Sequence, residues 1–272
     1  MQALSDPLLT ILTVNYNTSD FIEVMLHAFT RLTTNPYKVI ICDNGSDDRH
    51  LLHLARVAQA HSNVVVVFRK QSAPGSIGHG EAMDLLLDMV DTPYFVTMDA
   101  DASFLIKGWD ELLLSRLQGN VKAVGTQAPG DKPKDFPLMF AVLYETATFR
   151  RVGAGFMPRQ DPRAPSSLGD TGCEIRERFQ QQGYSGDVLE FRNTRTWKEG
   201  PFSDLLAAEF YMAATDSIVA SHYGRGSTGG LAKYQSWWRR IPVVGALVAR
   251  YRAACARQAW IARVRDIADA NT

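Results

Sequence analysis

The 272-residue chain has few cysteines, no long apolar run and no excess of charge of either sign. Its three cysteines, Cys42, Cys173 and Cys255, are far apart, odd in number and without a CxxC pair. This argues against a disulfide framework and against structural zinc. No apolar run reaches the length of a membrane span, and the first residues lack the basic and apolar regions of a signal peptide. We therefore expect a cytoplasmic protein, and the formal net charge of zero argues against broad nucleic-acid binding.

Acidic residues are missing from one long stretch near the carboxyl end. Between Asp216 and Asp266 there is no Asp or Glu, whereas Lys and Arg recur and Trp237, Trp238 and the apolar run 241–248 lie among them. A basic amphipathic helix with Trp is typical of a segment that contacts a membrane surface or a partner protein. The alternative is a helix packed on the domain, with its basic face in water and its Arg stems covering apolar surface. We expect residues 231–272 to form such a helical tail and leave the two roles open.

Apolar, β-branched runs alternate with segments of helical periodicity along roughly the first 105 residues. Strands are predicted at 8–14, 38–42, 63–68 and 94–98, with helices after Thr18, over 49–60, and after a Gly-rich loop at 72–80. This β-α-β-α-β-α-β order fits right-handed crossovers and predicts a doubly wound, mostly parallel sheet with helices on both faces. The second half is less regular, with helices at 109–117 and 175–183 and strands at 121–126, 138–143 and 188–191. Residues 150–168 show no clear pattern.

Polar clusters follow the predicted strands on one side only. Residues 15–18, residues 43–48 and the pair Asp99 and Asp101 each come directly after a strand. Open α/β sheets bind their ligands at the carboxyl ends of their strands. The clustering therefore predicts a nucleotide-type site, which a binding module or an enzyme could use.

The motif Asp99-Ala100-Asp101 ends the most apolar of these strands. In an extended chain, residues two apart point to the same side, so the two carboxylates are expected to project together. Two close carboxylates repel each other unless a cation or a proton lies between them. A hard divalent ion that also binds a diphosphate meets this need. The alternative is a solvated turn without function, because an Asp-x-Asp motif alone has a high false-positive rate.

Taken in order, these motifs resemble the nucleotide-binding half of glycosyltransferase family 2. The resemblance rests on a strand ending in residues 14–17, a second ending in Asp43-Asn44-Gly45-Ser46, the Gly-rich loop with its helix, and then the Asp-x-Asp motif. It covers the first 105 residues well, and residues 169–183 and the region of His222 more loosely. The family implies a GT-A-like α/β fold, here with a C-terminal helical extension, and a metal-dependent, inverting sugar transfer.

The resemblance also implies roles for individual residues. Asn15, Tyr16 and Asp43 are expected to line the base and ribose of a nucleoside-diphosphate sugar, and Asp99 and Asp101 to hold Mn²⁺ or Mg²⁺ and reach the ribose. The full set of implied nucleotide-sugar contacts is Val14, Asn15, Tyr16, Asp43, Asn44, Gly78, His79, Asp99, Ala100 and Asp101. The alternative for Asp43 is a purely structural Asx turn before Gly45.

An inverting transfer needs a base that takes the proton of the acceptor hydroxyl. The resemblance places it at the start of the helix that ends in Gly183-Tyr184, where Asp170 is the first candidate and Glu174 the second. The alternative for Asp170 is a helix N-cap. His222 matches a His that closes the metal site in many family members, although a lone His is more often a structural residue. Arg225 or Lys233 could contact the diphosphate.

These features predict a catalytic domain over 1–230, with a nucleotide-sugar half at 1–105 and an acceptor half at 106–230. The donor is expected to be a UDP-sugar, and the acceptor a carbohydrate or a lipid-linked hydroxyl, which the basic tail could meet at the inner face of the membrane. One rival function is a nucleotidyltransferase, but that class carries a Gly-rich basic loop after its first strand, where this chain has residues 15–18. The other rival is a non-catalytic nucleotide-sugar-binding or scaffold protein.

Overall fold

The computed structural model describes residues 6–130, 132–161, 164–234 and 244–272. Ten strands form one sheet in the order β3-β2-β1-β4-β7-β6-β10-β11-β12-β5. The bounds are β1 Leu9–Asn15, β2 Tyr37–Asp43, β3 Val64–Phe68, β4 Tyr94–Met98, β5 Ala102–Phe104, β6 Val121–Gln127, β7 Pro137–Glu145, β10 Ser185–Asn193, β11 Ala208–Met212 and β12 Ser217–His222. A separate antiparallel pair is formed by β8 Gln160–Asp161 and β9 Ala164–Leu168.

The first four strands of the sheet are parallel, as the alternating pattern predicts: β2 pairs with β3 and with β1, and β1 pairs with β4. The crossovers are α1 Ser19–Leu32, α2 Asp48–Gln59 and α3 Ser76–Asp88. The strands β1, β2 and β4 carry buried apolar side chains because helices cover both sides of the sheet, whereas the edge strand β3 has no buried residue. The predicted α/β class is confirmed.

The prediction of a Gly-rich loop over residues 72–80 is wrong in its second half, where α3 already begins at Ser76. A Cβ atom on Gly78 would lie 2.1 Å from the carbonyl oxygen of Ala73, and one on Gly80 would lie 2.7 Å from that of Phe156. The two glycines therefore let backbone segments pack closely against the first turn of the helix. They do not serve a flexible loop.

The second half of the chain extends the sheet with antiparallel strands. The strand β7 lies between β4 and β6 and runs antiparallel to both, while β6 and β10 are parallel. The strands β11, β12 and β5 follow in antiparallel order. Sequence patterns predicted neither β11 nor the three-residue β5, and the unassigned segment 150–168 holds β8 and β9. Strands this short are stabilised by their neighbours and leave no periodic signal of their own.

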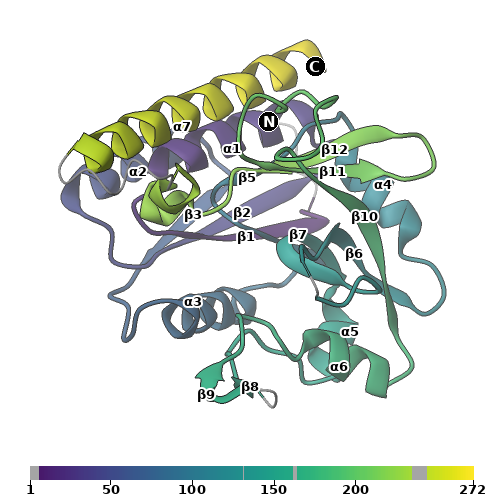
Figure 1. Ribbon diagram of the computed structural model, residues 1–272. Coiled ribbons are helices and arrows are strands. Elements are labelled where there is room, and N and C mark those ends of the chain that lie inside the picture. The colour runs from purple at the N-terminus through teal and green to yellow at the C-terminus, as the bar shows by residue number, and fades with distance from the viewer. Residues whose placement is uncertain (1–5, 131, 162–163, 235–243) are drawn as a thin grey trace.

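Helices cover both faces of the sheet (Figure 1). One apolar cluster joins the sheet to α1, α2, α4 (Trp109–Arg116) and α7 (Val244–Ala270). The other joins it to α3, α5 (Thr146–Arg151) and α6 (Ile175–Gln181). Residues at the carboxyl ends of β1 and β4 line the cavity described below, together with the first turn of α3.

The tail helix α7 lies along α1 (Figure 1). The side chain of Trp260 is fully buried, and its indole N–H donates to the Ser221 hydroxyl at 3.0 Å. Arg257 forms an ion pair with Asp20, so this part of the tail is packed on the domain. The division at residue 230 stays a prediction, and Trp237, Trp238 and residues 241–243 lie outside the described part. Within the described residues, no helix combines the length and the apolar character needed to cross a bilayer.

Candidate metal and nucleotide site

The side chains of Asp99, Asp101 and His222 meet at the carboxyl end of β4. The strand ends at Met98, and a turn in which the Ala102 N–H donates to the Asp99 carbonyl leads into β5. Because β5 pairs with β12, His222 lies opposite Ala102. One ligand atom from each of the three residues lies within 4.8 Å of the others. The two carboxylates therefore meet through a turn, whereas the sequence argument assumed an extended strand.

The three groups are strongly coupled. The His222 Nε2 atom lies 3.2 Å from Asp101 Oδ1 and 3.5 Å from Asp99 Oδ2. Burial raises the pKa of Asp99 to about 7, because the effect of nearby His222 is too small to offset it. Burial also acts to raise the pKa of Asp101, but His222 and the Gly226 N–H at 2.8 Å outweigh it and hold that pKa below its ordinary value. Burial acts to lower the pKa of His222, and the two carboxylates outweigh this and raise it.

This donor set fits a divalent cation. Two carboxylate oxygens suit Mg²⁺ or Mn²⁺, and an imidazole nitrogen is a common ligand for transition metals. With one ligand atom from each side chain, the three groups leave coordination positions for phosphate oxygens. A shared divalent cation would balance the charges of Asp99 and Asp101, two acids that lie close together.

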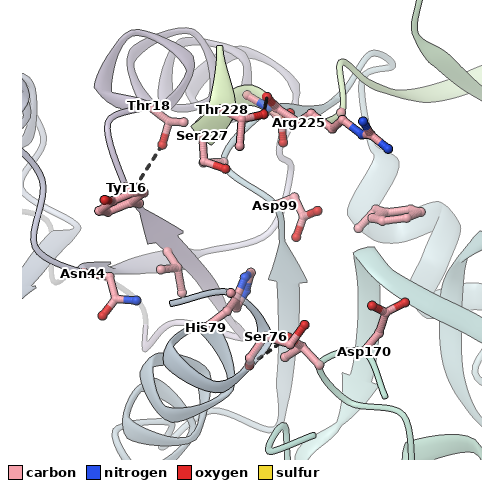
Figure 2. A pocket seen from close by; sticks show the side chains of 18 of the residues that line it. Tyr16, Thr18, Asn44, Ser76, His79, Asp99, Asp170, Arg225, Ser227 and Thr228 are labelled. Carbon is pink, nitrogen blue, oxygen red and sulfur yellow. Dashed lines mark hydrogen bonds between the residues drawn. The ribbon is translucent and has the colours of Figure 1, made fainter. Parts of the chain in front are cut away.

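The cluster opens into a cavity of about 790 Å³. We call this cavity the donor cleft. Of the residues that the sequence singled out, the cleft is lined by Val14, Tyr16, Asn44, His79, Asp99, Ala100, Asp101, Asp170, His222 and Arg225. Figure 2 shows Asp99, His79 and Asp170 projecting toward the same open space from three different segments.

Asn15, Asp43 and Gly78, for which the resemblance implies nucleotide-sugar contacts, are not among the residues that line the donor cleft. The side-chain amide of Asn15 donates to Asp43 Oδ2 at 2.6 Å. The other Asp43 oxygen accepts from the backbone N–H groups of Gly45 and Ser46. The Gly78 carbonyl accepts from the Asn44 amide at 3.0 Å. These residues hold the ends of β1, β2 and α3 together behind the wall, so the Asx-turn alternative describes Asp43 in this structure, and direct nucleotide contact by Asp43 stays a prediction.

The two candidate bases lie in different surroundings. Asp170 is exposed, lines the donor cleft and forms an ion pair with Lys132. It is not the N-cap, because α6 begins at Ile175 and Glu174 occupies the cap position. Glu174 forms ion pairs with Arg159 and Arg178 and does not line the donor cleft. This geometry favours Asp170 over Glu174.

The two candidate cations for the diphosphate also differ. Arg225 is exposed and lines the cleft, with a left-handed backbone at φ 60°. The ammonium group of Lys233 donates to the carbonyl oxygens of Leu206 and Tyr223 and lies over the Tyr223 ring. Burial lowers the pKa of Lys233 to about 8. Lys233 therefore supports the wall, and of these two cations Arg225 is the one that faces the cavity.

The structure adds cleft residues that sequence reasoning missed. Phe140, Ser227 and Thr228 line the cavity, and so does Lys132. Phe140 packs against His222, with ring centroids 4.4 Å apart. Nothing in the local sequence marks Phe140, whereas the Gly-rich run around Ser227 does indicate a loop.

Comparison with known proteins gives a consistent family and fold. The sequence profile described as Glycosyl transferase family 2 matches residues 10–164. A protein of Haemophilus influenzae named an uncharacterized glycosyltransferase is 23% identical over 122 residues, which are 44% of this chain and 36% of that protein. The processive diacylglycerol beta-glycosyltransferase of Mycoplasma pneumoniae is 26% identical over 112 residues, 41% of this chain and 32% of that protein. The matches thus span about a third of these relatives.

A solved structure is similar over nearly the whole chain. It is the mannosyltransferase PcManGT of Pyrobaculum calidifontis, in complex with GDP-Man and Mn²⁺. The TM-score is 0.55 at 15% identity, and the match covers 97% of this chain and 74% of that one. At this identity the likeness shows a shared fold and nothing finer.

Proposed function

Because the chain belongs to glycosyl transferase family 2, we propose that it transfers a sugar from a nucleoside-diphosphate donor to a hydroxyl acceptor. The observation that carries the proposal is the opening of the Asp99–Asp101–His222 cluster into one cleft with Tyr16 and Asp170. The similar mannosyltransferase structure, solved with GDP-Man and Mn²⁺, supports a nucleotide-sugar donor and a divalent metal. A UDP-sugar donor and a role in polysaccharide or glycolipid synthesis are part of the proposal.

We assign the donor's binding groups by their place in the cleft. Tyr16 and Asn44 line the side formed by β1 and β2, where the nucleoside would lie. Asp99, Asp101 and His222 would hold a divalent cation, which, when bound, neutralises the charge that develops on the leaving diphosphate. The guanidinium of Arg225, which lines the same cleft, would contact the same phosphates.

Asp170 is the proposed base. The acceptor oxygen would form a bond to the anomeric carbon while the bond from that carbon to the diphosphate oxygen breaks, with its electron pair leaving on the diphosphate. The acceptor proton would pass to the Asp170 carboxylate, which lines the same cleft. Attack from the face opposite the leaving group inverts the anomeric carbon. Lys132 would have to release Asp170 when the acceptor binds, because the two are ion-paired in this structure.

The test is a hydrolysis and transfer screen of nucleotide sugars with Mn²⁺ or Mg²⁺, comparing the natural chain with Asp101→Ala. We expect a metal-dependent activity that the variant loses. Equal turnover in both would contradict the assigned role of Asp101. In parallel, UDP should raise the melting temperature only with metal present, and CTP or ATP should not. Release of inorganic pyrophosphate from a nucleoside triphosphate would instead indicate a nucleotidyltransferase.

A further inference from the structure

A second cavity, of about 510 Å³, adjoins the donor cleft. The two cavities share Lys132, Leu138 and Asp170 in their linings, so the candidate base lies at their junction. We call the second cavity the acceptor pocket. Its interior is largely apolar, with Phe136, Pro137 and Ile175 among its walls. A molecule bound there would present a hydroxyl to Asp170 from the side away from the nucleotide.

The charged residues around the acceptor pocket leave no cation free for an anionic ligand, as far as the described residues show. The three basic side chains in its lining are Lys132, Arg159 and Arg176. They form ion pairs with Asp170, Glu174 and Asp135 respectively. An anionic acceptor would have to compete with a carboxylate for whichever of these cations it contacted, because each cation is already ion-paired. An uncharged acceptor needs only the Asp170 carboxylate to leave Lys132, and the Arg159 and Arg176 pairs can stay intact.

One hydroxyl in the pocket lining has no hydrogen-bond partner within the described part of the chain. Tyr144 on β7 is 1% exposed, and its ring stacks on Phe95 with centroids 5.1 Å apart. Tyr144 lines the acceptor pocket, and no hydrogen bond to its hydroxyl is found among the described residues. The hydroxyl oxygen is not among the fully enclosed atoms that lack a partner, so it is open to the pocket. Burial raises the pKa of this hydroxyl, so it stays protonated and can donate. Buried Tyr hydroxyls usually have a partner, and a ligand oxygen in the pocket would supply it.

We propose that the acceptor pocket binds an uncharged hydroxyl compound with an apolar body, oriented by a hydrogen bond from Tyr144. The proposal rests on the proposed transferase function and names the class of its acceptor. A glycoside with an apolar aglycone and a lipid alcohol share this chemistry. A sugar phosphate does not.

The first test reads binding without requiring any catalysis. Cys173 is exposed and lines the acceptor pocket, Cys42 is buried, and Cys255 is exposed on α7 outside the pocket. In a Cys255→Ser variant, the rate at which N-ethylmaleimide modifies Cys173 is measured by mass spectrometry. We expect octyl glucoside, below its micelle concentration, to slow this reaction several-fold. Methyl glucoside and glucose 6-phosphate should have little effect, and octanol shows whether the apolar body alone suffices.

Two controls make the result specific. In a Cys173→Ser variant, modification of Cys255 should not respond to octyl glucoside, which excludes an effect of the additive on the reagent. Tyr144→Phe should weaken protection about five- to tenfold, the loss of one hydrogen bond of about 1 kcal/mol. Tyr184→Phe, whose hydroxyl lies within 2.9 Å of Arg151 and outside the pocket lining, should leave protection unchanged.

The outcomes separate this proposal from the transferase function. Protection by glucose 6-phosphate as strong as by octyl glucoside, or no protection by any uncharged probe, would overturn the acceptor class. If that happened while nucleotide-sugar hydrolysis with metal persisted, the function would stand and the pocket assignment would fall. If octyl glucoside still protected Cys173 but the protein bound no nucleotide, the pocket assignment would stand and the transferase function would fall.

Discussion

Replacing Asp101 by Asn should remove most of the stabilisation that Mn²⁺ gives. The substitution preserves the shape of a side chain that is 7% exposed and keeps an oxygen that can accept from the Gly226 N–H. It removes one of the two charges that face His222. Without metal the variant should fold, because the Asp101 charge also acts to raise the pKa of Asp99 and that repulsion is relieved.

The magnitude follows from the number of ligands. Substituting a residue that only hydrogen-bonds to a metal ligand already lowers the metal affinity about 10–100-fold. Loss of one of three side-chain ligands should therefore lower the Mn²⁺ affinity at least about 100-fold. At a free Mn²⁺ concentration about 100 times the natural chain's Kd, binding stabilises the fold by about 2.7 kcal/mol. In the variant, the same concentration would only match Kd, which gives about 0.4 kcal/mol. For a chain of this size these values correspond to increases in Tm of roughly 5–11 °C and about 1 °C.

The assay is thermal unfolding followed by circular dichroism, with and without Mn²⁺. Asp170→Asn is the matched control, since it removes a carboxylate from the same cleft but not from the three-residue cluster. It should keep the full Mn²⁺ effect. If the Asp101 variant gained as much from Mn²⁺ as the natural chain, the cluster would not be the metal site.

Three further predictions concern the base, the imidazole of His79 and the tail. Asp170→Asn should lower transfer by about 10²–10⁴-fold, and Glu174→Gln should affect it much less, as measured by product release; the reverse order would reassign the base. Burial lowers the pKa of His79 from 6.5 to about 4. Between these pH values only the unfolded chain takes up the proton, so the free energy of unfolding should fall by on the order of 2 kcal/mol as pH drops from about 6.5 to 4. Denaturant unfolding of His79→Gln should not show this pH-dependent loss of stability. If the variant and the natural chain had the same pH profile, His79 would not be its cause. On α7, Leu247 and Tyr251 are 58% and 73% exposed, so replacing both with Ser should reduce sedimentation with anionic vesicles; if the natural chain does not sediment, the membrane role is wrong.

The tail experiment cannot be done by deleting residues from 231 onward. Trp260 is fully buried against Phe21 and Tyr223, and the latter packs beside the site. Such a deletion would expose the core, so a loss of vesicle binding would say nothing about the membrane. Substitution of exposed α7 residues avoids this problem.

Local sequence determined the parallel half of the fold and the edge of the sheet where the site lies. Apolar, β-branched runs and a 3.6-residue apolar period specify strands and helices within a few residues. The order of these elements then places residues 15–18, 43–48 and 99–101 at one edge. The Asp-x-Asp motif was visible for the same reason, since its neighbours along the chain are its neighbours in space.

Tertiary structure decided which side chains face the cleft. His222 reaches Asp101 from 121 residues away because β12 pairs with the three-residue β5, a pairing without a local signal. Asp43 turns inward because Asn15 and two backbone N–H groups compete successfully for its oxygens. The packing of α7 on α1, and the junction of two cavities at Asp170, likewise depend on contacts between distant segments. A pattern read along one segment reports that segment's periodicity, and it carries no information about which distant partner will satisfy a given side chain.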